Sequence, residues 1–270
     1  MIAVDWTRAW YAPWRDVGER VQSRWDAVGA LADALNQEPA AAVRFVPQSA
    51  LPEGEPYERF IHATGTCPTR ENLHDFFNGL CWLQLPATKG RLNVLQAQAI
   101  AQGGIGGRRG PVRDAITVFD ENGLLLDAPA PLWAALLARD WVRLFVELRP
   151  LWSEARALVV GHALLEKLAS PRKDMTAHVW AAPCPLHSVV AADAWLAVQC
   201  TPERLAAKPL TPLPVLGIPG WWPANENFSF YDDSVVFRPR KPRGDEKRAH
   251  AAATARLSSA SQAPCPARDP

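Results

Sequence analysis

The most constraining feature of the sequence is the apolar stretch at residues 72–96, NLHDFFNGLCWLQLPATKGRLNVLQ. Its hydrophobic side chains recur at the i, i+3, i+4 and i+7 spacing of one helix face: Leu73, Phe76, Phe77, Leu80 and Leu83. Pro86 separates this helix from a second one. Because the apolar face is wide, we expect the rest of the fold to cover both helices.

Polar side chains interrupt this stretch at His74, Asp75, Asn78, Lys89, Asn93 and Gln96. Such groups are costly to bury unless they are paired or used. Asn78 lies one helical turn after His74, and the last three follow one face of the second helix. If the helices pack as a hairpin, the two polar lines face each other around a pocket. We therefore expect His74 and Asp75 to be catalytic and the other four to bind substrate.

A purely structural explanation of these residues stays open. Asn72 is a good N-cap residue, and Asp75 suits the first turn of a helix. Asn78 and Asn93 would then satisfy backbone groups, and Lys89 would extend its ammonium group to water. The two explanations differ in one respect: a binding site requires these side chains to converge, and the structural explanation does not.

A second candidate site lies at Gly161–His162, where the apolar strand 158–160 passes into a helix. The junction between a strand and a helix N-terminus is a common place for ligands. Glu166 follows His162 by one helical turn, so that both side chains could hold one metal ion together with His74. We therefore expect His162 to be catalytic and a divalent metal to be the possible cofactor. A hydrogen-bonded imidazole without a ligand is the alternative.

The glycine-rich run GGIGGRRGPVR (103–113) offers backbone N–H groups next to Arg108 and Arg109. Guanidinium groups suit a phosphate or carboxylate, so we expect both arginines to bind substrate. The run is not a P-loop, because no Gly-Lys-Ser/Thr ends it. It could also serve only as a connector between elements.

Short helical and extended segments alternate along the rest of the chain. Helical spacing is found at 16–37, 131–157, 162–168 and 188–200. Extended segments are expected at 43–47, 57–65, 176–182 and 229–239. Asp120-Glu121-Asn122-Gly123 predicts the turn of a β-hairpin over 115–127, and residues 209–226 predict a long ordered loop rich in Pro and Trp.

These segments predict the α+β class. We expect one compact domain over 1–239 that is helix-rich with short strands, a β-hairpin and the Pro/Trp loop near the C-terminus, and helix 16–37 packed on it. Residues 240–270 lack large hydrophobic side chains almost entirely, which predicts a disordered tail.

The charge distribution and the cysteine content limit which binding partners and which cellular compartment we expect for the protein. Residues 238–270 carry eight Lys/Arg against three acids, which leaves a mildly acidic body. Nucleic acid is therefore an unlikely partner except weakly through the basic tail. No membrane span is expected, because no window of 18 residues is apolar and uncharged. The five cysteines are widely spaced and the N-terminus lacks the pattern of a signal peptide, which favours free thiols in the cytoplasm.

The motifs in 72–96 resemble those of an uncharacterised bacterial family, the domain of unknown function three-zero-two-five. Further resemblance lies in RRGPVRDAITVFDENG (108–123), GHALLEKL (161–168), TAHV (176–179) and PLPVLGIPGWWPAN with the FYDD and VFRP that follow it (212–239). The resemblance covers about 55–239 and implies no particular reaction.

Two functions therefore stay open. The first is a metal- or anion-handling, hydrolase-like enzyme that acts on a small anionic molecule in the pocket of 72–96. The second is a non-catalytic module that binds a metabolite or a protein partner through the Trp-rich loop 217–225, if Trp221 and Trp222 are exposed. The sequence contains no Gly-x-Ser-x-Gly, His-Glu-x-x-His or dinucleotide fingerprint, which disfavours the common hydrolases, zinc peptidases and NAD enzymes.

Overall fold

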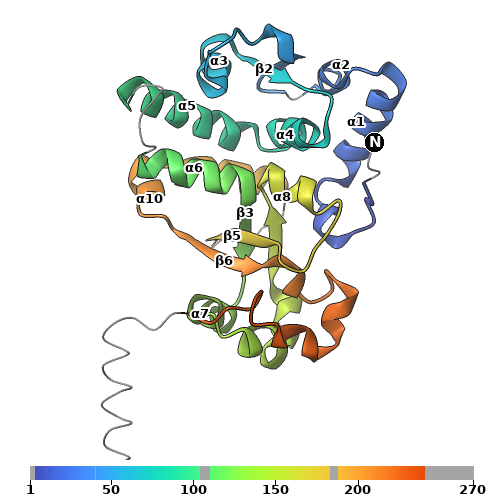
Figure 1. Ribbon diagram of the computed structural model, residues 1–270, viewed down its shortest axis with the longest axis vertical. Helices are drawn as coiled ribbons and strands as arrows, with labels where there is room; N and C mark the ends of the chain where they lie inside the picture. The colour runs from blue at the N-terminus through green and yellow to red at the C-terminus, as the bar shows by residue number, and fades with distance from the viewer. Residues whose placement is uncertain (1–3, 40, 104–109, 183–187, 241–270) are drawn as a thin grey trace, which may run out of the picture.

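The structure is a computed structural model that describes residues 4–39, 41–103, 110–182 and 188–240 (Figure 1). It has the predicted helix-rich α+β fold. The helices are α1 (Arg15–Val28), α2 (Leu31–Leu35), α3 (Tyr57–Thr64), α4 (Leu73–Gln84), α5 (Pro86–Gly103), α6 (Pro111–Asn122), α7 (Ala130–Ala138), α8 (His162–Lys167), α9 (Val189–Gln199) and α10 (Pro202–Ala206). The strands are β1 (Arg44–Pro47), β2 (Thr66–Thr69), β3 (Gly123–Asp127), β4 (Arg156–Val159), β5 (Thr176–Ala181) and β6 (Leu210–Pro214).

The described strands form two separate sheets. β1 and β2 pair in parallel, with α3 between them in the chain. The larger sheet has the order β4-β3-β5-β6, in which β3 runs parallel to β5 and antiparallel to β4, and β5 runs antiparallel to β6. The leucines of β3 are buried, as expected of a central strand, and Pro212 and Pro214 are tolerated because β6 lies at the edge.

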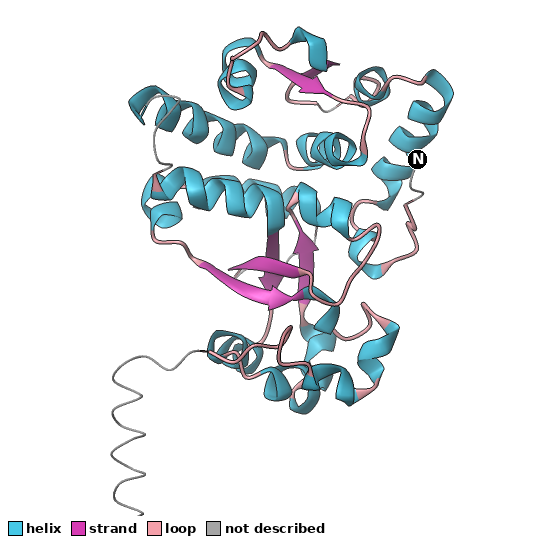
Figure 2. Cartoon of the chain, viewed as in Figure 1, coloured by secondary structure: helices cyan, strands magenta, loops and turns pink. Residues whose placement is uncertain are grey.

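The elements are stacked in layers along the long axis of the molecule (Figures 1 and 2). The small sheet with α3 lies at the top of the view, followed by α4 with α5, then α6 with α8, then the larger sheet, with α7 near the lower end. α4 packs on α8, and α5 packs on α3, α6 and α9. The site described below lies where the α4–α5 layer meets the α6–α8 layer.

One connected cluster of buried hydrophobic side chains extends from Val4 to Phe237. Trp10, Trp14 and Trp180 are among the largest side chains that are fully buried in it. The described cysteines, Cys67, Cys81 and Cys200, are buried free thiols. Within the described ranges, no helix has the length and apolar character that a membrane crossing requires.

The helix pair predicted at 72–96 is confirmed. Asn72 accepts a hydrogen bond from the Asp75 backbone N–H and caps α4, which ends at Gln84, and α5 begins at Pro86. The junction predicted at Gly161–His162 is also confirmed, since β4 ends at Val159 and α8 begins at His162. These two boundaries place His74 and His162 on the first turns of two packed helices.

The β-hairpin predicted over 115–127 is wrong. Pro111 opens α6, which buries Ala115, Ile116 and Phe119 and continues to Asn122. Gly123 has φ −71° and starts β3, so it does not adopt the positive φ that the expected Asn-Gly turn requires. Asp120 and Glu121 therefore lie on the last turn of a helix.

Several further segments differ from the prediction, including residues 210–214 of the expected loop 209–226, which form β6. Residues 57–64 form α3 instead of a strand, and Gly65 ends it with φ +66°. Gly29 ends α1 in the same left-handed conformation, with φ +75°, and thereby divides the predicted helix 16–37 into α1 and α2. The final segment 229–239 contains a 3-10 turn, Phe228–Asp232, instead of an extended run. Residues 104–109, with Arg108 and Arg109, and residues 241–270, for which a loop and a disordered tail are expected, lie outside the described residues.

Candidate functional site

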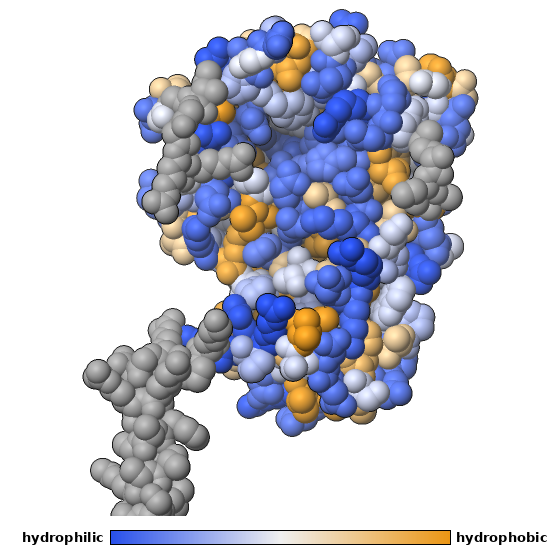
Figure 3. Space-filling model, in the orientation of Figure 1, coloured by the Kyte–Doolittle hydropathy of each residue, from blue (hydrophilic) through white to orange (hydrophobic). Residues whose placement is uncertain are grey.

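A cavity of about 320 Å³ lies between α3, α4 and α5 on one side and α6 and α8 on the other. Figure 3 shows a largely hydrophilic surface around a hollow in the upper half of the molecule. The polar residues that line the cavity are Gln48, Tyr57, Glu58, Arg70, His74, Asp75, Asn78, Lys89, Asn93, Gln96, Asp120, Glu121 and His162. The polar side chains predicted on the two helices therefore converge, together with His162.

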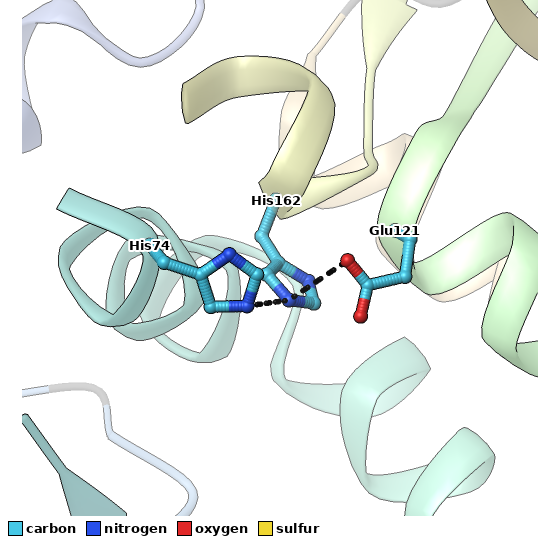
Figure 4. Close-up of side chains that lie close together, drawn as sticks. All are labelled: His74, Glu121 and His162. Atoms are coloured by element: carbon cyan, nitrogen blue, oxygen red, sulfur yellow. Dashed lines mark hydrogen bonds and ion pairs between the residues drawn. The ribbon is translucent and has the colours of Figure 1, made fainter. Parts of the chain in front are cut away.

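Two imidazoles and one carboxylate meet at this cavity (Figure 4). His74 comes from α4, His162 from the start of α8 and Glu121 from the end of α6. The Nε2 atoms of the two histidines are 3.1 Å apart, and Glu121 Oε2 lies 3.7 Å from His162 Nε2. Their ligand atoms all lie within 4.8 Å of one another, which is the geometry of a group that could hold a metal ion.

Glu166 does not belong to this group of three. Its Oε2 lies 2.9 Å from Nδ1 of His74, on the side of the ring opposite the cluster. A carboxylate in that position accepts a hydrogen bond from Nδ1–H and leaves Nε2 as the free ligand atom. The group that could hold a metal therefore differs from the predicted set of His74, His162 and Glu166: it contains Glu121, and Glu166 contacts Nδ1 of His74 instead.

The electrostatics of the cluster suit a cation. Burial lowers the pKa of His162 to about 4, so its imidazole is neutral and has a lone pair to offer at neutral pH. Burial and the neighbouring Asp120 raise the pKa of Glu121. A positive ion beside Glu121 would relieve the repulsion that it shares with Asp120.

Lys89 is held within the protein and has no donor left for a substrate. Its ammonium group donates to both carboxylate oxygens of Asp120, at 2.7 and 2.9 Å, and to Asn78 Oδ1 at 2.9 Å. Burial acts to lower the pKa of Lys89, but the Asp120 carboxylate, together with the nearby Cys81 and Cys67, outweighs it and the pKa is raised. The role expected for Lys89 in binding an anion is therefore revised to that of a buried partner for Asp120.

Asp75 is likewise committed to the protein. Its carboxylate accepts hydrogen bonds from the backbone N–H of Arg70 and from the Arg70 guanidinium, at 2.7 to 3.1 Å. Asn93 donates to the carbonyl oxygen of Glu58, which ties α5 to α3. In the part of the chain that the structure describes, the Gln96 amide has no such partner and lines the cavity. Gln96 and the outer part of Arg70 are thus the groups most available to a ligand.

Sequence reasoning missed Asp120 and Glu121 as site residues, because Asp-Glu-Asn-Gly was interpreted as a turn. The helical spacing of Ala115, Ile116 and Phe119 after Pro111 was the signal that could have found them. On a helix that ends against the Gly161 junction, both carboxylates are directed toward His162.

The donor set fits a divalent metal ion. Two nitrogens bound to one Zn²⁺ at 2.0–2.1 Å lie about 2.9 Å apart at a right angle and about 3.3 Å apart at the tetrahedral angle. The 3.1 Å between the two Nε2 atoms lies between these values. Two imidazoles and one carboxylate suit Zn²⁺, Fe²⁺ or Mn²⁺ and leave coordination positions for water and substrate.

The Trp-rich loop 217–225 is packed into the fold. Trp221 and Trp222 are partly buried against the core, and the Trp221 ring lies 6.0 Å from that of Trp10. The fully buried Asn225 donates to the carbonyl oxygens of Leu216 and Ile218. These contacts hold the loop in place, while both Trp side chains stay partly exposed and line a second pocket with Arg8 and Glu226. The binding-module hypothesis therefore stays a prediction.

The fold and the site together define an α+β domain with a polar cavity and a His-His-Glu cluster. Residues 43–241 match the model of a family described as protein of unknown function, DUF3025. The chain therefore belongs to this family, and the match is slightly longer than the predicted 55–239. No curated protein and no solved structure matches the chain.

Proposed function

We propose that the protein is a metal-dependent hydrolase in which His74, Glu121 and His162 hold one divalent cation. The observation that supports this most strongly is the convergence of two Nε2 atoms and one carboxylate from three different helices at one cavity. A cation with three protein ligands keeps a position for water and lowers the pKa of that water toward neutrality. His74, Glu121 and His162 would hold the cation, and the cation would supply an activated water for hydrolysis of the substrate.

The cavity suits a small polar substrate. Its volume is at the lower end of the range for small-molecule sites. Four carboxylates line the cavity, those of Glu58, Asp75, Asp120 and Glu121, together with the cationic side chains of Arg70 and Lys89. The formal charge of these six groups is negative, and one divalent cation would balance it. We therefore expect a substrate that is neutral or carries a single negative charge, with Arg70 and Gln96 contacting its polar groups.

An activity screen with a matched variant tests the proposal. The protein would be loaded with Zn²⁺, Mn²⁺, Co²⁺ or, without oxygen, Fe²⁺, and assayed on 4-nitrophenyl acetate, 4-nitroanilides and 4-nitrophenyl phosphate. We expect metal-dependent release of nitrophenol or nitroaniline from at least one uncharged substrate. Glu121→Gln keeps the shape of the side chain and removes its charge, so it should lower the rate by about 100-fold or more. Metal-independent hydrolysis, or a Glu121→Gln variant as active as the wild type, would contradict the proposal.

A further inference from the structure

The Nδ1 atom of His162 faces away from the His-His-Glu cluster, and the cluster does not account for its surroundings. Its side chain is buried, and among the described residues Nδ1 has no hydrogen-bond partner. The closest carboxylate oxygen to it is Asp120 Oδ2, at 3.7 Å. A buried ring nitrogen without a partner is costly, so its position calls for an explanation.

The hydrogen bonds of the two rings assign the proton of His162. The Nδ1 atom of His74 faces Glu166 at 2.9 Å and therefore carries the proton of that ring. The Nε2 atoms of the two rings lie 3.1 Å apart, so one ring donates to the other. Donation by His162 Nε2 leaves Nδ1 of His162 as a lone pair that faces a carboxylate, which accounts for the missing hydrogen bond and the 3.7 Å separation.

Metal binding reverses this arrangement. When both Nε2 atoms bind a cation, the hydrogen bond between the rings is lost and the proton of His162 must be on Nδ1. Asp120 is the acceptor in reach, and a movement of about 1 Å would close the distance to that of a normal hydrogen bond. One proton leaves Nε2 and one is taken up at Nδ1, so the exchange needs no net proton release.

Asp120 is held in place for this role. Lys89 binds both of its oxygens, and the same ammonium group is fixed by Asn78 and lies 5.5 Å from the Trp82 ring centroid. Asn78 in turn donates to the Tyr57 hydroxyl group. This buried chain of contacts fixes the carboxylate beside His162, as Glu166 does beside His74.

We propose that Asp120 is a positioning residue that accepts a hydrogen bond from Nδ1–H of His162 when a divalent cation binds, so that cation binding is coupled to a change of tautomer in His162. This inference rests on the proposed function, since it requires the cation at His74, Glu121 and His162. It assigns the buried Lys89–Asn78 pair to the support of Asp120.

Nitrogen NMR of protein labelled with [¹⁵N]histidine tests the inference with Zn²⁺ as the probe. Without metal, the His162 resonances, assigned with His162→Asn, should show a protonated Nε2. After addition of one equivalent of Zn²⁺, they should show a protonated Nδ1 and a metal-bound Nε2. Retention of the original tautomer in the Zn²⁺-bound protein would overturn the inference.

Affinity measurements separate positioning from a merely structural role. Asp120→Asn should weaken Zn²⁺ binding by about 10- to 100-fold. The double variant Asp120→Asn with Lys89→Met removes the unpaired ammonium group, so it should regain stability and keep the weakened affinity. Asp193→Asn is the matched control, because Asp193 is a buried carboxylate that accepts from the backbone of Ala87 and Thr88. It should lower stability and leave Zn²⁺ affinity unchanged.

The two proposals fail in different ways. If the wild type binds Zn²⁺ and loses it on substitution of His74, but Asp120→Asn binds as tightly as the wild type, the positioning role is wrong and the metal site stands. If the wild type does not bind Zn²⁺, Co²⁺, Mn²⁺ or Fe²⁺, the proposed function fails and the positioning role fails with it.

Discussion

The main chain of Gly161 lies directly against that of Gly123. A β-carbon on Gly161 would stand 2.4 Å from the Gly123 nitrogen and 2.5 Å from the Glu121 carbonyl oxygen. The backbone N–H groups of Val160 and Gly161 both donate to the Gly123 carbonyl oxygen. This close approach brings the end of α6 beside the start of α8, and with it Glu121 beside His162.

Gly161→Ala should therefore damage both stability and the cluster. The new methyl group meets backbone atoms that cannot move independently, so we expect a loss of about 1–3 kcal/mol in the free energy of unfolding. Separation of Glu121 from His162 should weaken Zn²⁺ binding by about tenfold. Urea unfolding and Zn²⁺ titration measure the two effects.

Gly90→Ala is the matched control for this variant. Gly90 lies within α5, and no atom lies within 4 Å of the β-carbon that the substitution adds. Alanine favours the helix, so this variant should be as stable as the wild type or more stable by up to about 1 kcal/mol. Equal behaviour of the two variants would contradict a special role of the Gly161 contact.

Acid should destabilise the metal-free protein through His162. Its pKa is about 4 in the folded state and 6.5 in the unfolded chain, so the unfolded chain binds more protons between these values. Stability therefore rises with pH across that window and is level above it. Glu121, whose pKa is raised, acts in the opposite direction.

Comparison with His162→Asn isolates the effect of this one residue. From pH 5 to pH 7, the wild type should gain about 2 kcal/mol more in unfolding free energy than the variant. Urea unfolding at the two pH values checks this. An equal gain in both proteins would show that His162 is not held neutral by burial.

Lys89 and Asp120 should behave as a coupled pair in the metal-free protein. Lys89→Met leaves the partly buried Asp120 carboxylate without its cation and should cost about 2 kcal/mol of stability. Adding Asp120→Asn removes that charge, so the double variant should be more stable than Lys89→Met alone. The outcome that contradicts this is a double variant whose loss equals the sum of the two single losses.

The sequence predicted the local parts of the site better than its assembly. The polar positions on α4 and α5, the break at Pro86 and the start of α8 at His162 follow from helical spacing and residue chemistry over a few neighbours. The position of Glu121 does not, because Asp-Glu-Asn-Gly is also the pattern of a turn. These residues form a helix instead of a turn, because the buried face of α6 packs against the sheet. That contact is not local in sequence.

The same limit explains why the group that could hold a metal contains Glu121 and not Glu166. One helical turn between His162 and Glu166 suggested that both side chains face one ion. In the fold, Glu166 faces the outer nitrogen of His74 instead, and Lys89 is neutralised by a residue 31 positions away. Which polar groups face the cavity and which support them depends on how α4, α6 and α8 pack.

The most direct measurement of the central claim is the metal content and metal affinity of the purified chain. Elemental analysis, combined with calorimetric titration of Zn²⁺, Co²⁺, Mn²⁺ and anaerobic Fe²⁺, would be applied to the wild type, His74→Ala and Glu121→Gln. The account predicts one tightly bound ion per wild-type chain and an affinity at least about 100-fold lower in both variants. A wild type that binds none of these ions, or variants that bind them as tightly as the wild type, would contradict it.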